Sequence, residues 1–399
     1  MEKKKTKVFI TGATGVMGFA GLKELMAKPE EYSVTALVRH SKKNVKKLSG
    51  FISSGLNVVW GHLLDRDSLS EGIKDADIVL HVGGMVSPLA EHFPEETLKV
   101  NVGSMRLIAE IVKSYESDNP ERIIKVVYIG SVSQYGPNMP PHQWANVCHT
   151  QTPAKFDAYA ESKILAEKVL REAGLRCWVS LRQTAIIHSG LLTKIDDPVI
   201  FHTPLKGVLE WVTVEDSGRL LERVCRQSLP DSFWNKAYNV GGGEKFRLIN
   251  MEFETKLMKA LHCPPPQKIF ETNWFATGNF HGVWFEDSDQ LDDILHFRAD
   301  DSFDKALSRL TSELPFYYKL APLAPAFIIK SFLHKVARKA PLGPLSWIED
   351  KDKAKIDAFF GSMKAYKEIP DWHNFSLPVL SRVTPKKSGT YVCDNDKNH

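Results

Sequence analysis

A short strand that leads directly into three spaced glycines constrains the fold of this chain more than any other feature. Residues 7–10 have the composition of a buried strand, and Gly12, Gly15 and Gly18 follow before a helical pattern of apolar residues begins. Gly12 permits a tight turn, Gly15 lets the backbone approach a pyrophosphate, and Gly18 lets the helix pack closely on the strand. Free amides at the start of such a helix face the phosphates. The pattern predicts a dinucleotide-binding site in an α/β fold.

The end of the second predicted strand, residues 33–39, bears on which dinucleotide binds. In this kind of fold that end meets the adenosine ribose, where an acidic residue would bind the ribose hydroxyls of NAD. This chain has Arg39 there, followed by His40, Ser41 and two lysines. Because a guanidinium suits a 2′-phosphate, the sequence favours NADP, with NAD as the other possibility. The alternative interpretation is a solvated basic turn.

Tyr159 and Lys163 form a candidate acid/base pair. They are four residues apart in a segment with a helical pattern, so their side chains share one face. An ammonium beside a phenol favours the phenolate, so we expect Lys163 to lower the tyrosine pKa from about 10 towards neutral. The spacing also arises by chance, and a surface pair on a helix is the alternative. The pair indicates catalysis only in combination with the dinucleotide site that precedes it in the sequence.

Further stretches, taken in order, resemble the extended short-chain dehydrogenase/reductase family, in its epimerase/dehydratase-like branch. The resemblance covers roughly residues 5 to 300 and is carried by residues 78–85, 101–104, 127–136, 181–184, 211–216 and 238–243. It implies an α/β Rossmann fold, with a doubly wound parallel sheet and a smaller C-terminal substrate-binding lobe. It also implies an NAD(P)-dependent enzyme.

The resemblance assigns roles to single residues. Tyr159 would exchange a proton with the reacting hydroxyl or carbonyl, and Lys163 would bind the nicotinamide ribose. Ser131 would hydrogen-bond the same substrate oxygen, with Ser133 as its substitute, and Asn101 would belong to the helix that supports the proton relay. Cofactor contacts, besides Tyr159 and Lys163, would come from Gly12, Thr14, Gly15, Val16, Met17, Gly18, Arg39, His62, Leu63, Val82, Gly83, Gly84, Gln183 and Thr184.

The chain also departs from the family pattern. His62 stands where many members have an acidic contact to the adenine amine, and Gln183 replaces a usual proline. Sugar-nucleotide 4,6-dehydratases carry an acidic pair directly after the catalytic serine or threonine. Here those positions are Val132 and Ser133, and neither side chain can serve as the acid or base for elimination of water. The sequence therefore argues against that class.

Aromatic and apolar residues dominate the segments expected to form the substrate pocket. Candidate contacts are Met85, Ser133, Trp144 and Trp211, and the same segments contain Trp274, Phe275, Phe280, Trp284 and Phe285. An apolar pocket suits a hydrophobic ligand, whereas a nucleotide sugar needs cations and polar groups. The sequence thus points to hydride transfer at a hydroxyl or ketone of a hydrophobic, steroid-like molecule, as in the branch resembling 3β-hydroxysteroid dehydrogenases and dihydroflavonol reductases. The alternative is that these aromatics form the core of the lobe.

Two other functions stay open at this point. A nucleotide-sugar epimerase or reductase shares the Ser-Tyr-Lys set. A cofactor-sensing binding protein without turnover is the third possibility, and the intact set argues against it.

Length and pattern suggest more than one unit in the 399 residues. We expect a Rossmann domain over 1–185, to which 211–245 return, and a substrate-binding lobe over 186–210 and 246–312. A helical extension would occupy 313–383, and a polar, disordered tail 384–399.

Composition limits the partners. A net charge of only +4 argues against nucleic-acid binding, and the five scattered cysteines and the dispersed histidines show no metal-site spacing. The odd cysteine count suits a reducing cytoplasm. Residues 325–340 have an apolar and a basic helical face, which predicts peripheral contact with an anionic membrane or, alternatively, packing on the enzyme or on a second subunit. The helices around Asn101 and Tyr159 resemble those that pair in family homodimers.

Overall fold

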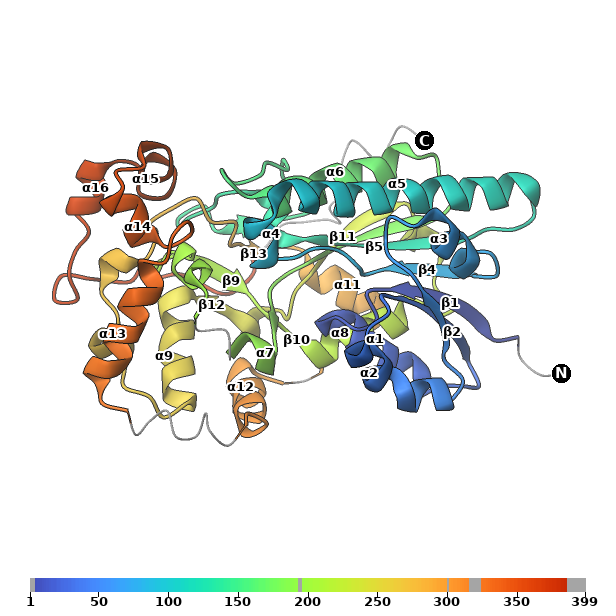
Figure 1. Ribbon diagram of the computed structural model, residues 1–399, viewed down its shortest axis with the longest axis horizontal. Helices are drawn as coiled ribbons and strands as arrows, with labels where there is room; N and C mark the ends of the chain where they lie inside the picture. Colours follow the sequence, from blue (N-terminus) through green and yellow to red (C-terminus); the bar gives the residue numbers. More distant parts are fainter. Residues whose placement is uncertain (1–3, 193–195, 300, 316–323, 386–399) are drawn as a thin grey trace.

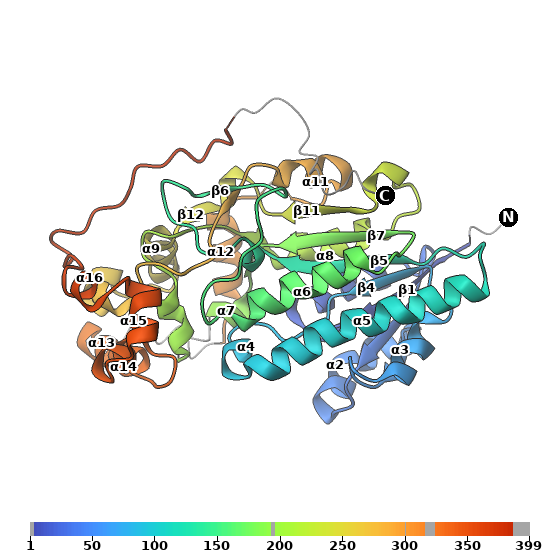
Figure 2. The same cartoon turned by 90° about the horizontal axis from the view of Figure 1, so that it is seen from above.

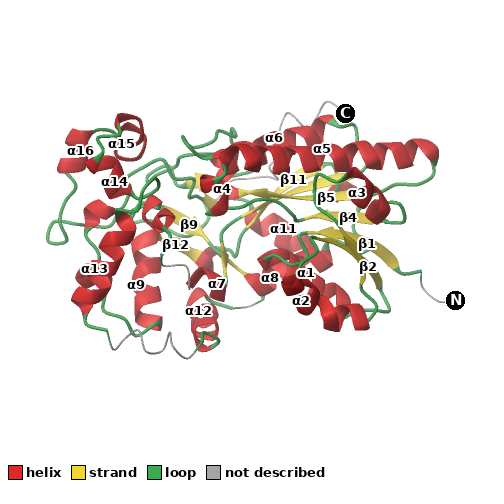
Figure 3. Ribbon diagram, in the orientation of Figure 1, coloured by secondary structure: helices red, strands yellow, loops and turns green. Residues whose placement is uncertain are grey.

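Seven parallel strands form the centre of the computed structural model, which describes residues 4–192, 196–299, 301–315 and 324–385 (Figures 1 and 3). The strands, in their order across the sheet, are β11 (Lys236–Val240), β7 (Trp178–Gln183), β5 (Lys125–Ser131), β4 (Ile78–His81), β1 (Thr6–Thr11), β2 (Tyr32–Val38) and β3 (Asn57–Trp60). This is the doubly wound sheet that the sequence predicts. The strand order reverses between β1 and β4, and ligands bind such sheets at the carboxyl ends beside that reversal.

Helices cover both faces of the sheet (Figure 2). One face carries α1 (Val16–Met26), α2 (Lys42–Ser53), α8 (Val214–Arg223) and α11 (Ser288–Leu295). The other carries α3 (Arg66–Ile73), α5 (Pro94–Asp118) and α6 (Ala158–Glu172). Because helices bury the sheet on both sides, the central strands are nearly continuous apolar runs.

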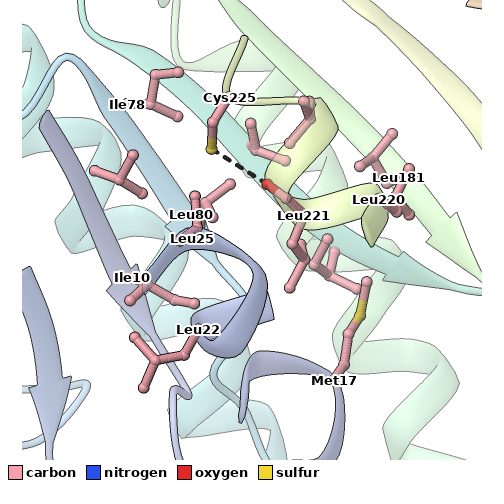
Figure 4. Close-up of a cluster of buried hydrophobic side chains, with 14 of the residues drawn as sticks. Ile10, Met17, Leu22, Leu25, Ile78, Leu80, Leu181, Leu220, Leu221 and Cys225 are labelled. Carbon is pink, nitrogen blue, oxygen red and sulfur yellow. Dashed lines mark hydrogen bonds between the residues drawn. The ribbon is translucent and has the colours of Figure 1, made fainter. Parts of the chain in front are cut away.

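The core on the α1 face shows how the two halves of the chain meet (Figure 4). Strand residues such as Ile10 and Leu80 pack with Leu22 of α1 and Leu221 of α8. The helices approach closely at Gly218, because a Cβ atom there would lie 2.9 Å from the backbone of α1 at Ala20. Residues beyond 211 therefore complete the covering of β1 and its glycine turn.

A second lobe follows the carboxyl ends of the strands. Its short elements are β6 (Trp144–Ala145), β8 (Ile186–Ile187), α7 (Ser189–Leu192), η2 (Pro198–His202), β9 (Val208–Glu210), β10 (Val212–Thr213), η4 (Glu244–Phe246), β12 (Arg247–Ile249), α9 (Asn250–Ala260), α10 (Pro266–Ile269), η5 (Thr272–Trp274), β13 (Trp284–Phe285) and α12 (Phe303–Ser312). The short turn η3 (Asp231–Phe233) belongs to the sheet domain, where Phe233 packs in the core of the α1 face. A buried ion pair joins them, with Arg247 Nε 2.8 Å from Glu210 Oε2. Glu210 Oε1 also accepts a hydrogen bond from the backbone of Gly243, which ties the lobe to the turn after β11.

The C-terminal extension consists of α13 (Ala326–Ala337), α14 (Pro344–Glu349), α15 (Lys353–Phe360) and α16 (Met363–Lys367). Leu333 and Val336 of α13 are buried against the lobe, so one part of its apolar surface packs on the enzyme. Phe327, Ile328 and Phe332 remain exposed. The chain after α16 then runs back along the molecule (Figure 2), where Arg382 Nε donates to the backbone oxygen of Arg247. Of the predicted tail from residue 384, all but the first two residues lie outside the described parts.

Among the described cysteines, Cys177, Cys225 and Cys263 carry free thiols. Within the described ranges, no helix is long and apolar enough to cross a membrane, and no cluster of His, Cys, Asp and Glu side chains could hold a metal ion.

Candidate active site

The turn after β1 leaves no room for a side chain at Gly12 or at Gly18, as the glycine pattern predicts. Gly12 adopts a φ of 72°, and a Cβ atom on it would lie 2.7 Å from Gly83 Cα. A Cβ atom on Gly18 would lie 2.2 Å from the carbonyl oxygen of Gly12. Gly15 and Val16 are exposed where α1 begins, whereas Met17 points into the core. The first amides of α1 thus border an open backbone cradle that fits a pyrophosphate.

Asn101 of α5 fixes the loop that follows β4. Its Oδ1 atom accepts from Met85 N at 2.8 Å, and its Nδ2 atom donates to Met85 O at 2.9 Å and to Ser162 Oγ at 2.9 Å. A Cβ atom on Gly84 would lie 2.8 Å from Asn101 Oδ1, so the loop passes close to the amide. In these contacts Asn101 acts as a positioning residue, and it links the loop to Ser162 of α6.

His81 extends this network to the glycine turn. Ser104 Oγ donates to Asn101 O, so it accepts from His81 Nε2 at 3.1 Å, and His81 Nδ1 accepts from Thr11 Oγ1 at 2.9 Å. Thr11 Oγ1 in turn accepts from Gly83 N. Every member is satisfied when the imidazole is neutral, and burial lowers the His81 pKa to about 3.

Ser131, Tyr159 and Lys163 meet at the carboxyl end of β5. Ser131 ends that strand, and its hydroxyl shares a hydrogen bond with the half-buried phenol of Tyr159 on α6. Lys163 lies one turn further along α6, is buried, and donates from Nζ to Ile129 O at 2.7 Å. Its ammonium lies 5.8 Å from the centre of the Tyr159 ring. The structure thus brings the three predicted residues together.

The expected direction of the tyrosine pKa shift is wrong. Burial raises the pKa of Tyr159 to about 12, and the hydrogen bond with Ser131 offsets this only in part. A nearby cation favours the phenolate, but the loss of solvent around the phenol disfavours that charged form and outweighs the cation here. Burial also lowers the Lys163 pKa to about 8.

Hydrogen bonds fix the position of Ser131, and most of them come from residues that were not predicted from the sequence. The backbone N of Ser131 donates to Gln134 Oε1 at 2.6 Å, and Gln134 Nε2 donates to Glu167 Oε2 at 2.9 Å. Arg182 Nη2 lies 2.6 Å from Glu167 Oε1 in a fully buried pair. Burial alone would raise the Glu167 pKa, but Arg182 and the surrounding donors lower it to about 2. Ser133 Oγ donates to Ser131 Oγ at 3.0 Å, so Ser133 supports the serine in this structure.

Gln183 supplies an unused acceptor next to the serine. It pairs with Ser131 in the register of β5 and β7, and its buried Oε1 atom has no hydrogen-bond partner among the described residues. A carboxamide such as that of nicotinamide could donate to it, so the residue fits the predicted cofactor. Thr184 is buried as well, and its hydroxyl donates to Glu210 O.

Basic residues lie at the end of the predicted cofactor site where the adenosine ribose is expected. Arg39 is exposed directly after β2, and Lys47 Nζ donates to Thr14 O in the glycine turn at 2.8 Å. Burial lowers the Lys47 pKa, and the like charges of Lys43 and Lys23 lower it further. An anion bound here would relieve that repulsion.

The other residues predicted near the adenosine and nicotinamide lie in the loops after β3 and β4. His62 is exposed, and its Nδ1 accepts from Leu64 N at 3.3 Å. Leu63 and Val82 are half-buried, and Leu63 reaches the backbone at Gly83.

The tryptophans expected to line a substrate pocket serve the lobe core instead. Trp211 is buried and stacks on Phe253 with ring centres 4.6 Å apart. Trp144 packs edge-on against the fully buried Trp284 and lies under the Arg247 guanidinium. The alternative interpretation, that these aromatics are core residues, therefore describes them better.

Apolar side chains in and around α4 (Leu89–His92), which packs against α6, are exposed, as is one in the segment just before Tyr159. Each exposes half or more of its surface, and they are Val86, Leu89, Phe93 and Phe156.

Comparison with known proteins relates this site to a family. Residues 8–241 match the model of the NAD dependent epimerase/dehydratase family. Similar solved structures include dTDP-glucose 4,6-dehydratase from Bacillus anthracis in complex with NAD, at 16% identity and a TM-score of 0.61, covering 77% of this chain and 96% of that one. UDP-glucose 4-epimerase from Thermus thermophilus in complex with NAD shows 20% identity and a TM-score of 0.57, covering 77% and 98%. At these identities the likeness concerns the fold.

Curated relatives match over shorter stretches. UDP-N-acetylglucosamine 4,6-dehydratase (inverting) from Campylobacter jejuni is 30% identical over 102 residues, which are 25% of this chain. The chain spans only about 30% of the length of the first curated relatives that it matches. A 4-hydroxy-2-methyl-3-oxo-4-farnesyl-3,4-dihydroquinoline-1-oxide ketoreductase from Stigmatella aurantiaca is 25% identical over 223 residues, which are 55% of this chain and 60% of that protein.

Proposed function

Because the chain belongs to the NAD-dependent epimerase/dehydratase family, we propose that it transfers hydride to or from a hydroxyl or ketone of a hydrophobic small molecule. The observation that carries the proposal is the cluster of Ser131, Tyr159 and Lys163 at the carboxyl end of β5. Only β4 separates that strand from β1 and its glycine turn. The nicotinamide dinucleotide, when bound, supplies or accepts the hydride.

The protein's own groups handle the proton. In reduction, Tyr159 donates its phenol proton to the developing alkoxide, and a pKa of about 12 keeps that proton on the phenol at neutral pH. The Ser131 hydroxyl stabilises the same oxygen, with its position fixed by Gln134 and Ser133. Lys163 carries a positive charge next to the site when the pH is lower than about 8. In oxidation the same groups act in reverse.

We propose NADP as the preferred cofactor. Arg39 is exposed at the end of β2, and Lys47 reaches the glycine turn from the same side. Replacement of Arg39 by alanine should lower the ratio of kcat/KM for NADPH over NADH by about tenfold or more, because a charge-assisted contact to the 2′-phosphate is lost. The matched control is Lys74→Ala, which removes a surface cation paired with Glu71 on α3. An unchanged ratio in the Arg39 variant would remove the basis for this preference.

Two features support a hydrophobic substrate. Apolar residues of α4 and of the segment before Tyr159, among them Leu89 and Phe156, are exposed rather than buried. The Stigmatella aurantiaca relative is named as the ketoreductase of a farnesylated ring compound, in which a 3-oxo group stands next to a 4-hydroxyl group. A steroid-like ring system is one molecule of this class.

A nucleotide-sugar epimerase is the second candidate, and the similarity of the fold to UDP-glucose 4-epimerase favours it. A dehydratase has less support, because the two positions after Ser131 are Val132 and Ser133, which carry no acid.

The first test measures loss of nicotinamide absorbance with NADPH and NADH, against keto-steroids, aryl ketones and nucleotide 4-keto-sugars. We expect the hydrophobic ketones to be reduced, and Tyr159→Phe to lower kcat by about a hundredfold or more while NADPH binding persists. Activity on nucleotide sugars alone would overturn the substrate class and move the epimerase to first place. NADPH binding without turnover on any compound would favour a cofactor-sensing protein.

A further inference from the structure

The segment of residues 277–283, here called the bridging segment, connects the lobe and its C-terminal extension to the chain that leads into α6. At its start, Thr277 N donates to Phe359 O of α15 at 2.9 Å. At its end, Val283 O accepts from Glu210 N of β9 at 3.2 Å. Because both ends are hydrogen-bonded to other elements, the residues between them have a defined position.

Two side chains of the bridging segment hold the chain just before α6. Lys155 N donates to Asn279 Oδ1 at 2.9 Å, and Asn279 Nδ2 donates to Lys155 O at 2.8 Å. Two residues further along each segment, His281 Nδ1 lies 3.2 Å from Asp157 Oδ2. Because a carboxylate oxygen can only accept, the imidazole donates from Nδ1 in this contact.

Phe156, between these two contacts, has a backbone conformation that needs such support. Its φ is 63°, in the left-handed region that a bulky side chain rarely adopts. A residue in this conformation persists only where its surroundings fix it, and such residues are common at functional sites. Tyr159 follows three residues later. The contacts on both sides of Phe156 therefore fix the direction in which the chain enters the catalytic helix.

Asp157 carries this support into the first turn of α6. It is the N-cap of the helix, and its Oδ1 atom accepts from a backbone amide of that turn at 2.8 Å. In the same turn, Tyr159 O accepts from Ser162 Oγ at 2.7 Å, and Ser162 Oγ accepts from Asn101 Nδ2. The turn that carries the catalytic tyrosine therefore has two supports, Asn101 of α5 and His281 of the bridging segment.

The contact between Asp157 and His281 is largely shielded from water. Their side chains are 13% and 24% exposed. The Phe280 ring stacks on the imidazole with ring centres 4.6 Å apart, which fixes the plane of the imidazole. Because little water competes for the hydrogen bond, the pair can hold one geometry.

We propose that His281 is a positioning residue for catalysis, which acts through Asp157 to keep the Tyr159 phenol within reach of Ser131 and of the reacting oxygen. This inference rests on the proposed hydride transfer and adds a residue of the lobe to it. The exchange of hydride and proton is unchanged. A proton donor displaced by about 1 Å can lower the rate by about a hundredfold, so a contact of this kind affects turnover.

The test measures kcat and KM for the ketone that the unaltered protein reduces fastest in the panel above, and the dissociation constant of NADPH. His281→Leu should lower kcat by about tenfold. KM and the NADPH dissociation constant should change by less than about twofold, because the position of the proton donor matters only in the transition state.

Three further variants make the result specific. His281→Asn places an amide nitrogen where Nδ1 was, so it should retain most of kcat. Asp157→Ser keeps a capping hydroxyl but removes Oδ2, so it should cause the same loss as His281→Leu. His373→Leu, at an exposed position after α16, is the matched control and should leave all three quantities unchanged. Circular dichroism verifies that each variant is folded.

A double variant separates positioning from a general effect on the lobe. In Tyr159→Phe the proton donor is absent, so adding His281→Leu should lower the remaining kcat by less than about twofold. A general effect of His281 on the structure would lower kcat by the same factor with and without the Tyr159 hydroxyl.

Each outcome decides a separate point. If His281→Leu and Asp157→Ser leave kcat unchanged, or if the loss is equal in both backgrounds, the role of His281 is overturned and hydride transfer stands. If only nucleotide 4-keto-sugars are reduced, the proposed substrate class fails, and the same variants measured on those sugars decide the role of His281. Turnover on no compound overturns both. A loss that asparagine prevents, and that disappears without the Tyr159 hydroxyl, supports the inference.

Discussion

At the scale of single residues, burial moves the two titrating groups of the site in opposite directions. Tyr159 has a pKa of about 12 and Lys163 a pKa of about 8. In ketone reduction the Tyr159 phenol therefore stays protonated well above neutral pH. Lys163 loses its proton, and with it its positive charge, at a lower pH than Tyr159. We predict that kcat/KM for reduction falls as the pH rises through about 8, and that the fall reports Lys163.

A pH–rate profile of the unaltered protein and of Lys163→Arg checks this assignment. Arginine stays charged over the whole range, so its profile should lack the fall near pH 8, at a lower absolute rate. The assignment fails if the unaltered protein shows no fall up to about pH 10.

Some residues of the site could be predicted and others could not. Gly12, Gly15 and Gly18 were predictable because glycine spacing after a strand has a steric cause that the sequence displays. Glu167 left a weaker signal, since it continues the Tyr159–Lys163 spacing and so lies on a buried helix face. Glu91 left none, because a lone glutamate in the four-residue helix α4 gives no sign of burial until the tertiary structure encloses it.

At the scale of elements, the Glu167–Arg182 pair connects α6 to β7 and, through Gln134, to the catalytic serine. We predict that Glu167→Gln lowers the free energy of unfolding at neutral pH by about 3–5 kcal/mol, because Arg182 is left as a buried unpaired charge. The control is Glu172→Gln, whose exposed pair with Lys168 should contribute less than about 1 kcal/mol. Chemical denaturation measures both.

The same pair predicts the acid behaviour of the protein. The Glu167 pKa is about 2 in the folded state, below its ordinary value of 4.5. Its contribution is therefore complete above about pH 4.5 and is lost as the pH falls towards 2. The difference in stability between the unaltered protein and Glu167→Gln should shrink below that pH, and a constant difference would contradict the assignment.

The contact between α1 and α8 depends on the lack of side chains at their crossing. A Cβ atom on Gly218 would lie 2.9 Å from Ala20, whereas one on Gly50 in α2 would meet no atom within 4 Å. We predict that Gly218→Ala lowers the free energy of unfolding by about 1–3 kcal/mol through overpacking. Gly50→Ala should be neutral or stabilising by about 0.5–1 kcal/mol. Equal effects of the two substitutions in thermal or chemical unfolding would show that the crossing tolerates a methyl group.

The same elements show where the sequence pattern was not sufficient. Alternating strands and helices were predictable because apolar periodicity is local. The position of Trp211 could not be predicted. An aromatic side chain in a lobe segment has the same local sequence pattern whether it lines a pocket or, as here, stacks on Phe253 in the core.

At the scale of the whole molecule, α13 presents an apolar surface away from the lobe. Phe327 is 72% exposed, Phe332 is 42% exposed, and Lys335 lies on the same side. We predict that the protein sediments with vesicles containing phosphatidylserine, and that the double variant Phe327→Ser, Phe332→Ser binds them about tenfold or more weakly because the inserted apolar area is lost.

Two controls define this result. Ile123→Ser, a similarly exposed apolar position before β5, should leave vesicle binding unchanged. Neutral phosphatidylcholine vesicles should bind less protein, because the basic residues of the helix no longer contribute. Equal loss of binding in both variants, or no binding at all, would exclude α13 as the contact. Homodimer formation through α5 and α6 and a cytoplasmic location stay predictions from the sequence.

The packing of α8 on α1 has a consequence for how the protein is made. The glycine turn is complete in sequence by residue 18, yet α8 ends at Arg223 and the edge strand β11 ends at Val240. During synthesis, β1 and α1 therefore expose one apolar face until α8 and β11 have been made, which requires more than half of the chain to have left the ribosome. Fragments that stop at residue 185 should aggregate, and a nascent chain should first bind dinucleotide when β11 has emerged.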